Sequence, residues 1–202
     1  MAEAGGCALT GLVLAGGRSS RLGSGGEFGP DKGLASFHDE PLVARACRYL
    51  RGQGAEPILI SANRHAAQYG EHGRVITDPA WSEAFQGPLL GIAAALEVAA
   101  HEWLLVVPVD VLDLPADMAV RLMAAADAAH PAYACTPDGP HPLCLLVHRS
   151  LGANLRSWLA GGGRKVQAWL ARVGARAVDF EGAGFLNLNT PEDWRQAGAS
   201  PP

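Results

Sequence analysis

LVLAGGRSSR, residues 12–21, closes an apolar run that starts at Leu9, and DKG, residues 31–33, follows it along the chain. The length of the run and its glycine-rich end predict a buried strand that leads into a tight turn. Ala15, Gly16 and Gly17 in that turn let a ligand approach the backbone, whose N–H groups can bind an anion. Positive charge nearby comes from Arg18, Arg21 and Lys32. The stretch therefore predicts a site for a nucleoside triphosphate.

This glycine turn matches neither of the two common glycine fingerprints for nucleotides. A Walker A loop requires Lys-Ser or Lys-Thr directly after its last glycine, whereas Lys32 lies well downstream of Gly17. A dinucleotide fingerprint requires glycines at its first, third and sixth positions, which Gly16-Gly17 does not supply. A plain strand-to-helix turn with solvated charges stays open as an alternative for the turn taken alone, because glycine is common in loops.

Size, charge and cysteine content narrow the class of protein. The chain has 202 residues, which predicts one domain, taken as residues 9–195 between disordered termini at 1–8 and 196–202. A net charge of -4 argues against a general nucleic-acid binder, although local cations can still hold a small anion. The cysteines show no zinc-like spacing. With no visible signal peptide and no apolar run of about 18 residues, we expect a cytoplasmic protein that spans no membrane.

Short apolar runs alternate with stretches of helical periodicity. The runs that we predict as strands are 9–15, 57–61, 74–77, 103–107, 143–147 and 177–180. The stretches that we predict as helices are 42–50, 89–100, 115–129, 150–159 and 165–172, with one more opened by Pro191 behind a capping Thr190. This alternation predicts an α/β fold with a mainly parallel sheet.

Polar or small residues follow four of these strands. The groups are Ala15-Gly16-Gly17 after the first strand, Asn63 after the second, Asp78 after the third and Asp110 after strand 103–107. In open parallel sheets, ligands bind beyond the carboxyl ends of the strands. If these strands are parallel neighbours, the four groups lie at one edge of the sheet, where they can form a single site.

Asp110 is the candidate metal ligand among them. A carboxylate at the tip of an apolar strand suits Mg²⁺, which takes one or two protein carboxylates together with waters and phosphate oxygens. Alternatively, Asp110 caps the next helix or ends the strand, and Asp113 is a competing carboxylate nearby. Asn63 and Asp78 can bind a base or sugar and Lys32 can neutralise phosphates, although each also suits an ordinary turn or loop.

No protein nucleophile is visible in the sequence. The Ser, Thr and Cys residues lack the partner patterns of nucleophilic catalysis, and the seven histidines do not cluster at metal-binding spacing. This suits a reaction in which one substrate brings the nucleophile.

Taken in order, these segments resemble the signature of nucleotidyltransferases built on a Rossmann-like sheet. More narrowly, they resemble the molybdenum cofactor guanylyltransferase (MobA) family. The matching segments are LAGGRSSRLG (14–23), DKG (31–33), ANRH (62–65), VITD (75–78), GPLLGI (87–92), PVD (108–110) and NLNTPED (187–193). The resemblance runs from about residue 9 to 194 and implies a single-domain, three-layer α/β sandwich around a mainly parallel central sheet.

The resemblance implies transfer of GMP from GTP to the terminal phosphate of molybdopterin, with pyrophosphate released and Mg²⁺ as cofactor. Carried over by position, Lys32 binds phosphate, Asn63 and Asp78 bind the guanosine, and Asp110 holds the magnesium ion. Arg21 joins Lys32 and Asp110 in the implied catalytic set. The implied binding set is Leu14, Ala15, Gly16, Gly17, Arg18, Lys32, Asn63, Asp78, Gly87, Asp110, Asn187 and Asn189.

The implied partners are GTP, molybdopterin and, more loosely, other molybdenum cofactor biosynthesis proteins or molybdoenzyme chaperones, with no nucleic acid and no membrane. Segments that match the family's pterin side are His141-Pro142, Arg164-Lys165-Val166, Asn187 and Asn189.

The chain departs from the family pattern in a longer, glycine-rich loop between Arg21 and Asp31, which is either a lid that orders on GTP or a tolerated insertion. It also places Val111-Leu112-Asp113 after Asp110, where relatives often place a proline soon afterwards.

Three other functions stay open. They are a molybdopterin cytidylyltransferase, another small-molecule nucleotidyltransferase, and a non-catalytic nucleotide-binding accessory protein. The choice of guanine comes from the resemblance and not from the chemistry of the residues.

Overall fold

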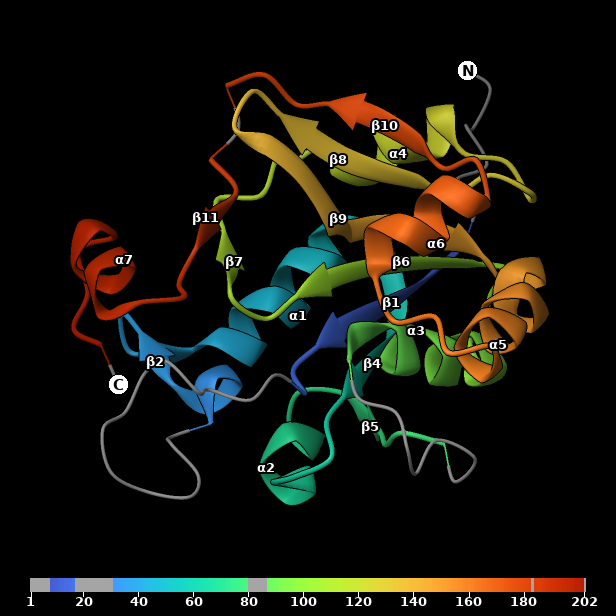
Figure 1. Ribbon diagram of the computed structural model, residues 1–202. Coiled ribbons are helices and arrows are strands. Elements are labelled where there is room, and N and C mark those ends of the chain that lie inside the picture. Colours follow the sequence, from blue (N-terminus) through green and yellow to red (C-terminus); the bar gives the residue numbers. More distant parts are fainter. Residues whose placement is uncertain (1–7, 17–30, 80–86, 183, 202) are drawn as a thin grey trace, which may run out of the picture.

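The central sheet carries the residues of interest at its strand ends. The computed structural model describes residues 8–16, 31–79, 87–182 and 184–201. Within these ranges a seven-stranded sheet has the order β10-β8-β9-β6-β1-β4-β5 (Figure 1). Its strands are β1 (Leu9–Leu14), β4 (Ala55–Ser61), β5 (Arg74–Ile76), β6 (Trp103–Pro108), β8 (Ala132–Thr136), β9 (Gly139–His148) and β10 (Arg176–Asp179).

The sheet is mainly parallel, as the sequence predicts. β1 pairs in parallel with β4 and β6, and β4 in parallel with β5, so four neighbouring strands end at the same edge. β9 is antiparallel to both β6 and β8. It follows β8 after two residues, a connection that can join antiparallel strands but is too short for the crossover that parallel strands need.

Helices cover both faces of the sheet. Those of the described ranges are α1 (Leu42–Gly52), α2 (Ala66–Gly70), α3 (Pro88–Val98), α4 (Met118–Ala125), α5 (Gly152–Ala160), α6 (Val166–Arg172) and α7 (Pro191–Gln196), with short 3₁₀ turns at Lys32–Leu34 and Arg149–Leu151. The amphipathic α1 turns its buried residues, from Leu42 to Leu50, toward one face. The Ala- and Leu-rich α3 is buried over most of its length against the other face.

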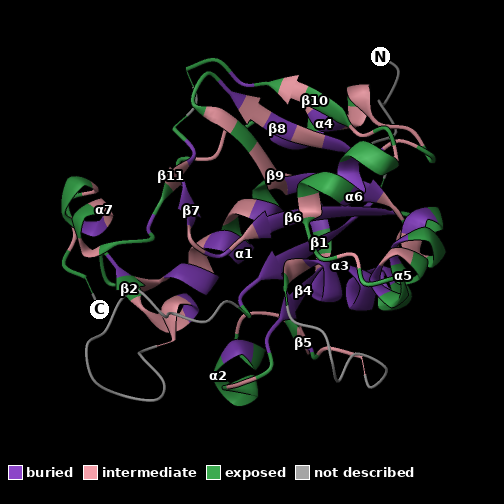
Figure 2. Cartoon of the chain, viewed as in Figure 1, coloured by how far each residue is buried: buried purple, intermediate pink, exposed green. Residues whose placement is uncertain are grey.

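Two apolar clusters, one on each face of the sheet, define three layers. Along β1, Leu9 and Val13 join the cluster under α1, α4 and α7, whereas Leu12 and Leu14 join the cluster under α3, α5 and α6. Successive side chains of a strand point to opposite faces, so a strand buried on both faces is apolar throughout. Figure 2 shows that burial is greatest along β1, β4 and β6, at the centre of the sheet.

A small antiparallel ribbon ties the C-terminal part of the chain to the sheet edge. β7 (Val111–Leu112) pairs with β11 (Leu186–Asn187), directly after the loop that carries Asp110. Figure 1 shows β7, β11 and α7 at the end of the sheet toward which β1 and β6 point. A second ribbon joins β2 (Ser36–Phe37) to β3 (Glu40–Pro41).

Several elements differ from the sequence-based expectation, among them the short β2, β3, α2, β7 and β11, which the sequence does not predict. The helix expected to reach residue 129 ends at Ala125, and Asp127 then forms a turn whose carboxylate accepts from the backbone N–H of His130 at 2.9 Å. That turn leads into β8, which the sequence analysis did not predict. At the C-terminal end, α7 runs to Gln196, and Ala197 and Ala199 pack against the core.

Within the described ranges, no helix combines the length and the apolar character needed to cross a bilayer.

We predict that Gly91→Ala destabilises the fold, whereas Gly52→Ala does not. A Cβ at Gly91 of α3 would lie 2.9 Å from Cβ and 2.4 Å from Oγ of Ser61, at the end of β4. Such overpacking costs about 1–3 kcal/mol of unfolding free energy. A Cβ at Gly52 of α1 meets nothing within 4 Å. Urea denaturation of both variants checks this; equal midpoints would contradict the close approach of α3 to β4.

Candidate active site

The turn after β1 is held by both neighbouring strands. Leu14 pairs with Ser61 of β4 on one side and with Pro108 of β6 on the other. The Ala15 N–H donates to the Ser61 carbonyl at 3.0 Å, and the Val109 N–H donates to the Leu14 carbonyl at 3.1 Å. Leu14 and Ala15 are buried and Gly16 is exposed. The carboxyl ends of β5, β4, β1 and β6 therefore form one continuous edge, as the sequence predicts.

Asn63 and Asp78 form a polar pair at the β4–β5 end of this edge. Asn63 Nδ2 donates to Asp78 Oδ2 at 2.7 Å, and the Asp78 backbone N–H donates to Asn63 Oδ1 at 2.9 Å. The two bonds fix both side chains relative to each other. An ionised carboxylate offers about four acceptor positions, so Asp78 can still accept from a ligand such as a base or a ribose.

Lys32, Asp110 and Asn189 meet at the β6 end. The Lys32 ammonium lies 2.6 Å from Asp110 Oδ2 and donates to Asn189 Oδ1 at 2.9 Å. The side chains of Lys32 and Asp110 are only 13% and 23% exposed, so water screens this ion pair less than a surface pair. Residues from three remote parts of the chain thus form one charged centre.

Asp110 is anchored from two directions. It lies two residues beyond β6, whose residues 103–107 are buried in the middle of the sheet. Its backbone carbonyl accepts from the Leu188 N–H at 3.0 Å, because the β7–β11 ribbon brings that segment alongside. The competing carboxylate Asp113 lies beyond β7 in a left-handed conformation, with φ of 54°.

Asn189 is placed by the cap of α7. Its backbone N–H donates to Asp193 Oδ2 at 2.8 Å, and Thr190 and Asp193 cap the helix reciprocally. Although desolvation opposes it, the hydrogen bonds from Thr190 and Asn189 lower the pKa of Asp193, so the carboxylate stays ionised. Trp194, fully buried, packs near Phe37 and fixes α7 to the core.

The oxygen atoms around the Lys32 ammonium suit a divalent cation. Asp110 Oδ2 and Asn189 Oδ1 already share one positive charge, and both are the hard oxygen ligands that Mg²⁺ prefers. No group of three or more His, Cys, Asp or Glu side chains that could hold a metal occurs in the described ranges. A metal ion needs only a few protein ligands when substrate phosphates and waters fill the rest of its coordination shell.

The structure also describes two further expected site residues, Gly87 and Asn187. Gly87, at φ of 133°, precedes α3 in a conformation that favours glycine, and Asn187 lies exposed in β11 opposite Val111. Gly17, Arg18 and Arg21, as well as the glycine-rich loop after Arg21, lie outside the described residues.

Besides Asn187 and Asn189, the residues expected on the pterin side lie on β9 and where α5 leads into α6. His141 Nε2 is 3.0 Å from the Thr136 hydroxyl, its ring stacks on Phe185, and burial lowers its pKa. Arg164 donates to the backbone carbonyls of Leu159 and Gly163, and Lys165 directly precedes α6.

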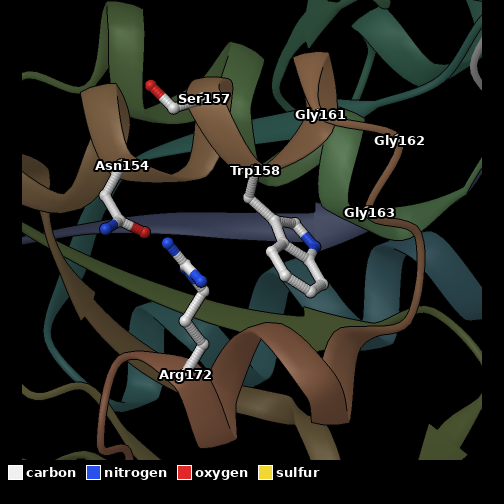
Figure 3. A pocket seen from close by; sticks show the side chains of 7 residues that line it. All are labelled: Asn154, Ser157, Trp158, Gly161, Gly162, Gly163 and Arg172. Atoms are coloured by element: carbon white, nitrogen blue, oxygen red, sulfur yellow. The ribbon is translucent and has the colours of Figure 1, made fainter.

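A cavity of about 470 Å³ lies between α5 and α6, apart from the charged centre. Figure 3 shows the Asn154 and Arg172 side chains facing each other across it, with the Trp158 ring at its side. Its lining consists of Asn154, Ser157, Trp158, Gly161, Gly162, Gly163 and Arg172. None of the residues expected to bind the nucleotide lines this cavity.

Two features of the site carry no signal that the sequence analysis could use. Tyr69, whose hydroxyl donates to Asp31 Oδ1 at 2.5 Å, looks like any core aromatic in the sequence. The contact between Lys32 and Asn189 depends on β7 and β11, strands of two residues each that are too short to show a period. The sequence itself predicts the Thr190 cap and the helix opened by Pro191, whereas Asn187 and Asn189 enter the predicted site only through the resemblance.

Comparisons with known proteins identify the family to which the sequence is similar. The sequence profile of the MobA-like NTP transferase domain matches residues 11–176. A molybdenum cofactor guanylyltransferase of Serratia proteamaculans (strain 568) is 42% identical over 193 residues, which cover 93% of this chain and 94% of that protein.

Solved structures share the fold at lower identity. Molybdopterin-guanine dinucleotide biosynthesis protein A from Archaeoglobus fulgidus superposes with a TM-score of 0.69 at 20% identity, covering 93% of this chain and 96% of that one. Rv0371C of Mycobacterium tuberculosis H37Rv, solved in complex with manganese, gives 0.67 at 17% identity, covering 94% and 97%. At these identities the superpositions show the fold alone.

We predict that Lys32→Ala tightens divalent-metal binding in the absence of nucleotide. The ammonium occupies the oxygen atoms that a metal would use, so its removal frees them and removes a repelling charge. We expect Mn²⁺ to bind about tenfold more tightly, or about 1.4 kcal/mol, when free Mn²⁺ is measured by electron paramagnetic resonance.

The matched control for this prediction is Lys165→Ala, which removes the only other lysine of the chain. Lys165 precedes α6, and its loss should leave Mn²⁺ affinity within about twofold. Unchanged or weaker Mn²⁺ binding by Lys32→Ala would show that lysine and metal do not compete at Asp110.

Proposed function

This chain belongs to the MobA-like NTP transferase domain family and is a nucleotidyltransferase, and we propose that it transfers GMP from GTP to molybdopterin. The acceptor is the terminal phosphate of molybdopterin, and pyrophosphate is released. The proposal takes residues 9–195 as one nucleotidyltransferase domain. The observation that carries it is the meeting of Lys32, Asp110 and Asn189 at the end of β6, one strand from the glycine turn after β1.

The reaction requires two polyanions to approach each other. A phosphate oxygen of the acceptor attacks the α-phosphorus of GTP, and the bond from that phosphorus to the bridging oxygen of the β-phosphate breaks. The electron pair of that bond leaves with pyrophosphate. Positive charge and fixed geometry lower such a barrier, and no protein nucleophile takes part. The absence of a nucleophile pattern in the sequence agrees with this chemistry.

Each half of the site has a role in the proposal. Lys32 leaves Asp110 to neutralise phosphate charge, and Asn189 orients the ammonium. Asp110 and Asn189 would hold Mg²⁺, which would supply Lewis-acid charge at the reacting phosphate. The family uses a divalent metal, and manganese in the structure of Rv0371C supports a metal here. Arg21 would add positive charge to the triphosphate.

The other end of the edge would bind the guanosine. Asn63 and Asp78 offer amide and carboxylate groups at fixed positions, and the glycine turn of Leu14, Ala15, Gly16, Gly17 and Arg18 would hold the phosphates between the two ends. The choice of guanine rests on the name of the Serratia relative. Gly87, Asn187 and Asn189 would complete the binding surface.

The proposal also covers the residues that bind the acceptor molybdopterin, the partner proteins and the cellular compartment. His141, Arg164, Lys165 and Asn187 would face the pterin. Contacts with other molybdenum cofactor proteins or molybdoenzyme chaperones would deliver or remove this cofactor. The cytoplasm is the proposed compartment, because it supplies GTP.

Transfer assays with four nucleotides test the function. Purified protein, molybdopterin and Mg²⁺ are incubated with GTP, CTP, ATP or UTP, and pyrophosphate and the dinucleotide product are quantified. We expect turnover with GTP at least about 100-fold faster than with the others. Preferential turnover of CTP would assign the chain to cytidylyl transfer, and no turnover with any nucleotide would contradict an enzymatic role.

We predict that Asp110→Asn nearly abolishes transfer while the protein stays folded. Asparagine keeps an oxygen that can accept from Lys32 but lacks the charge that a metal requires, so kcat should fall by at least about 100-fold. Steady-state kinetics at saturating Mg²⁺, with circular dichroism as the check on folding, measure this.

Asp179→Asn is the control, since Asp179 lies exposed on β10 at the far edge of the sheet. It should keep kcat within about twofold. Full turnover by Asp110→Asn would remove Asp110 from the catalytic set.

A further inference from the structure

From the contacts around Asp31 we infer that Tyr69 is a positioning residue for Lys32, which links the lysine to the segment that carries Asn63. The inference deepens the proposed function, on which it rests, by naming a residue that acts on the phosphates through Lys32. The link is the hydrogen bond from the Tyr69 hydroxyl to Asp31, the residue before Lys32.

Asp31 organises the backbone around Lys32. Its Oδ1 accepts from the Gly33 N–H at 3.2 Å, which caps the 3₁₀ turn Lys32–Leu34, and from the Tyr69 hydroxyl at 2.5 Å. The Asp31 side chain is only 10% exposed. The backbone on both sides of Lys32 is therefore fixed by one carboxylate, whose position Tyr69 in turn fixes.

Tyr69 is suited to this role by its burial. The residue is fully buried on α2, and desolvation, followed by the hydrogen bond to Asp31, raises the pKa of its hydroxyl far above the usual range. Both effects favour the neutral phenol, which can donate to Asp31. The fit is also tight, since a Cβ added at Gly33 would lie 2.3 Å from the Tyr69 hydroxyl oxygen.

The same segment supplies the base-binding Asn63. Tyr69 lies one turn into α2, and its N–H donates to the carbonyl of His65 at 3.1 Å. Arg64 Nη2 and His65 Nε2 lie 3.8 and 3.9 Å from Asp31 Oδ2. Side chains from residues 64, 65 and 69 thus converge on Asp31, so a ligand that orders Asn63 also steadies the residue next to Lys32.

These contacts also explain which carboxylate Lys32 pairs with. Asp31 is the neighbour of Lys32 in the sequence, whereas Asp110 lies 78 positions away. Asp31 Oδ1 accepts from Gly33 and Tyr69, and Asp31 Oδ2 lies near Arg64 and His65. Asp110 Oδ2 instead accepts from the Lys32 ammonium at 2.6 Å. Tyr69 thus helps to direct the lysine toward the reacting end of the site.

A double-mutant cycle with tripolyphosphate tests the inference without any transfer chemistry. Affinities for Mg²⁺-tripolyphosphate are measured by calorimetry for the wild type, Tyr69→Phe, Lys32→Ala and the double variant. If Tyr69 acts through Lys32, Tyr69→Phe weakens binding about tenfold in the wild type and less than about twofold in the Lys32→Ala background, because contributions of coupled residues are not additive.

Tyr49→Phe is the matched control. The Tyr49 hydroxyl also donates from a partly buried position, to the Pro115 carbonyl at 2.7 Å, but it touches neither Asp31 nor Lys32. It should lower the unfolding midpoint by a similar amount and leave tripolyphosphate affinity within about twofold. An equal loss of tripolyphosphate affinity from Tyr69→Phe in both backgrounds, or no loss in either, would show that Tyr69 only packs in the core and does not act through Lys32.

The cycle separates this inference from the proposed function. Additive losses in a protein that transfers GMP would overturn the role of Tyr69 and leave the transferase intact. A non-additive cycle in a protein that transfers no nucleotide would support the link between Tyr69 and Lys32 and contradict the proposed reaction.

Discussion

The ion pair between Lys32 and Asp110 is the contact on which the account of this protein depends. The Lys32 ammonium lies 2.6 Å from Asp110 Oδ2, so the pair joins the 3₁₀ turn of Lys32 to the residues just beyond the central strand β6. Asn189, which precedes α7, accepts a hydrogen bond from the same ammonium. An uncompensated carboxylate at a partly buried strand end is costly, so the free protein keeps a cation beside Asp110. The same need for a cation makes the position suitable for a metal when phosphates draw the lysine away.

The fold supplies rigidity at the points where this charge is concentrated. β1, β4 and β6 are buried on both faces, and backbone hydrogen bonds tie the turn after β1 to both neighbours. The polar residues of the site appear where these strands leave the core, whereas Thr10 of β1 is buried within it. Asn63 and Asp78 lie at one end of this row of strand ends, and Lys32 and Asp110 lie at the other. In the proposed function, this separation orients an extended ligand that has a neutral end and an anionic end.

The sequence predicts the parts of this arrangement that depend on local pattern. Buried strands appear as apolar runs, and Asn63, Asp78 and Asp110 follow three of these runs, which places them at the same end of a parallel sheet. Long-range contacts formed by short elements could not be predicted. The β7–β11 ribbon has two residues in each strand, and the Tyr69 hydroxyl reaches Asp31 across 38 positions of sequence, so neither leaves a periodic signal. β8 was missed because its mixed residues follow an unexpectedly early end of α4.

A crystal structure with GTP and Mg²⁺ is the most direct test of the central claim. The account predicts that the base lies against Asn63 and Asp78, that the α-phosphate and the metal lie at Asp110, and that the Lys32 ammonium has moved from the carboxylate to the phosphates. A nucleotide seated in the cavity between α5 and α6, or bound with its base at Asp110 and Lys32 still paired as in the free protein, would contradict it.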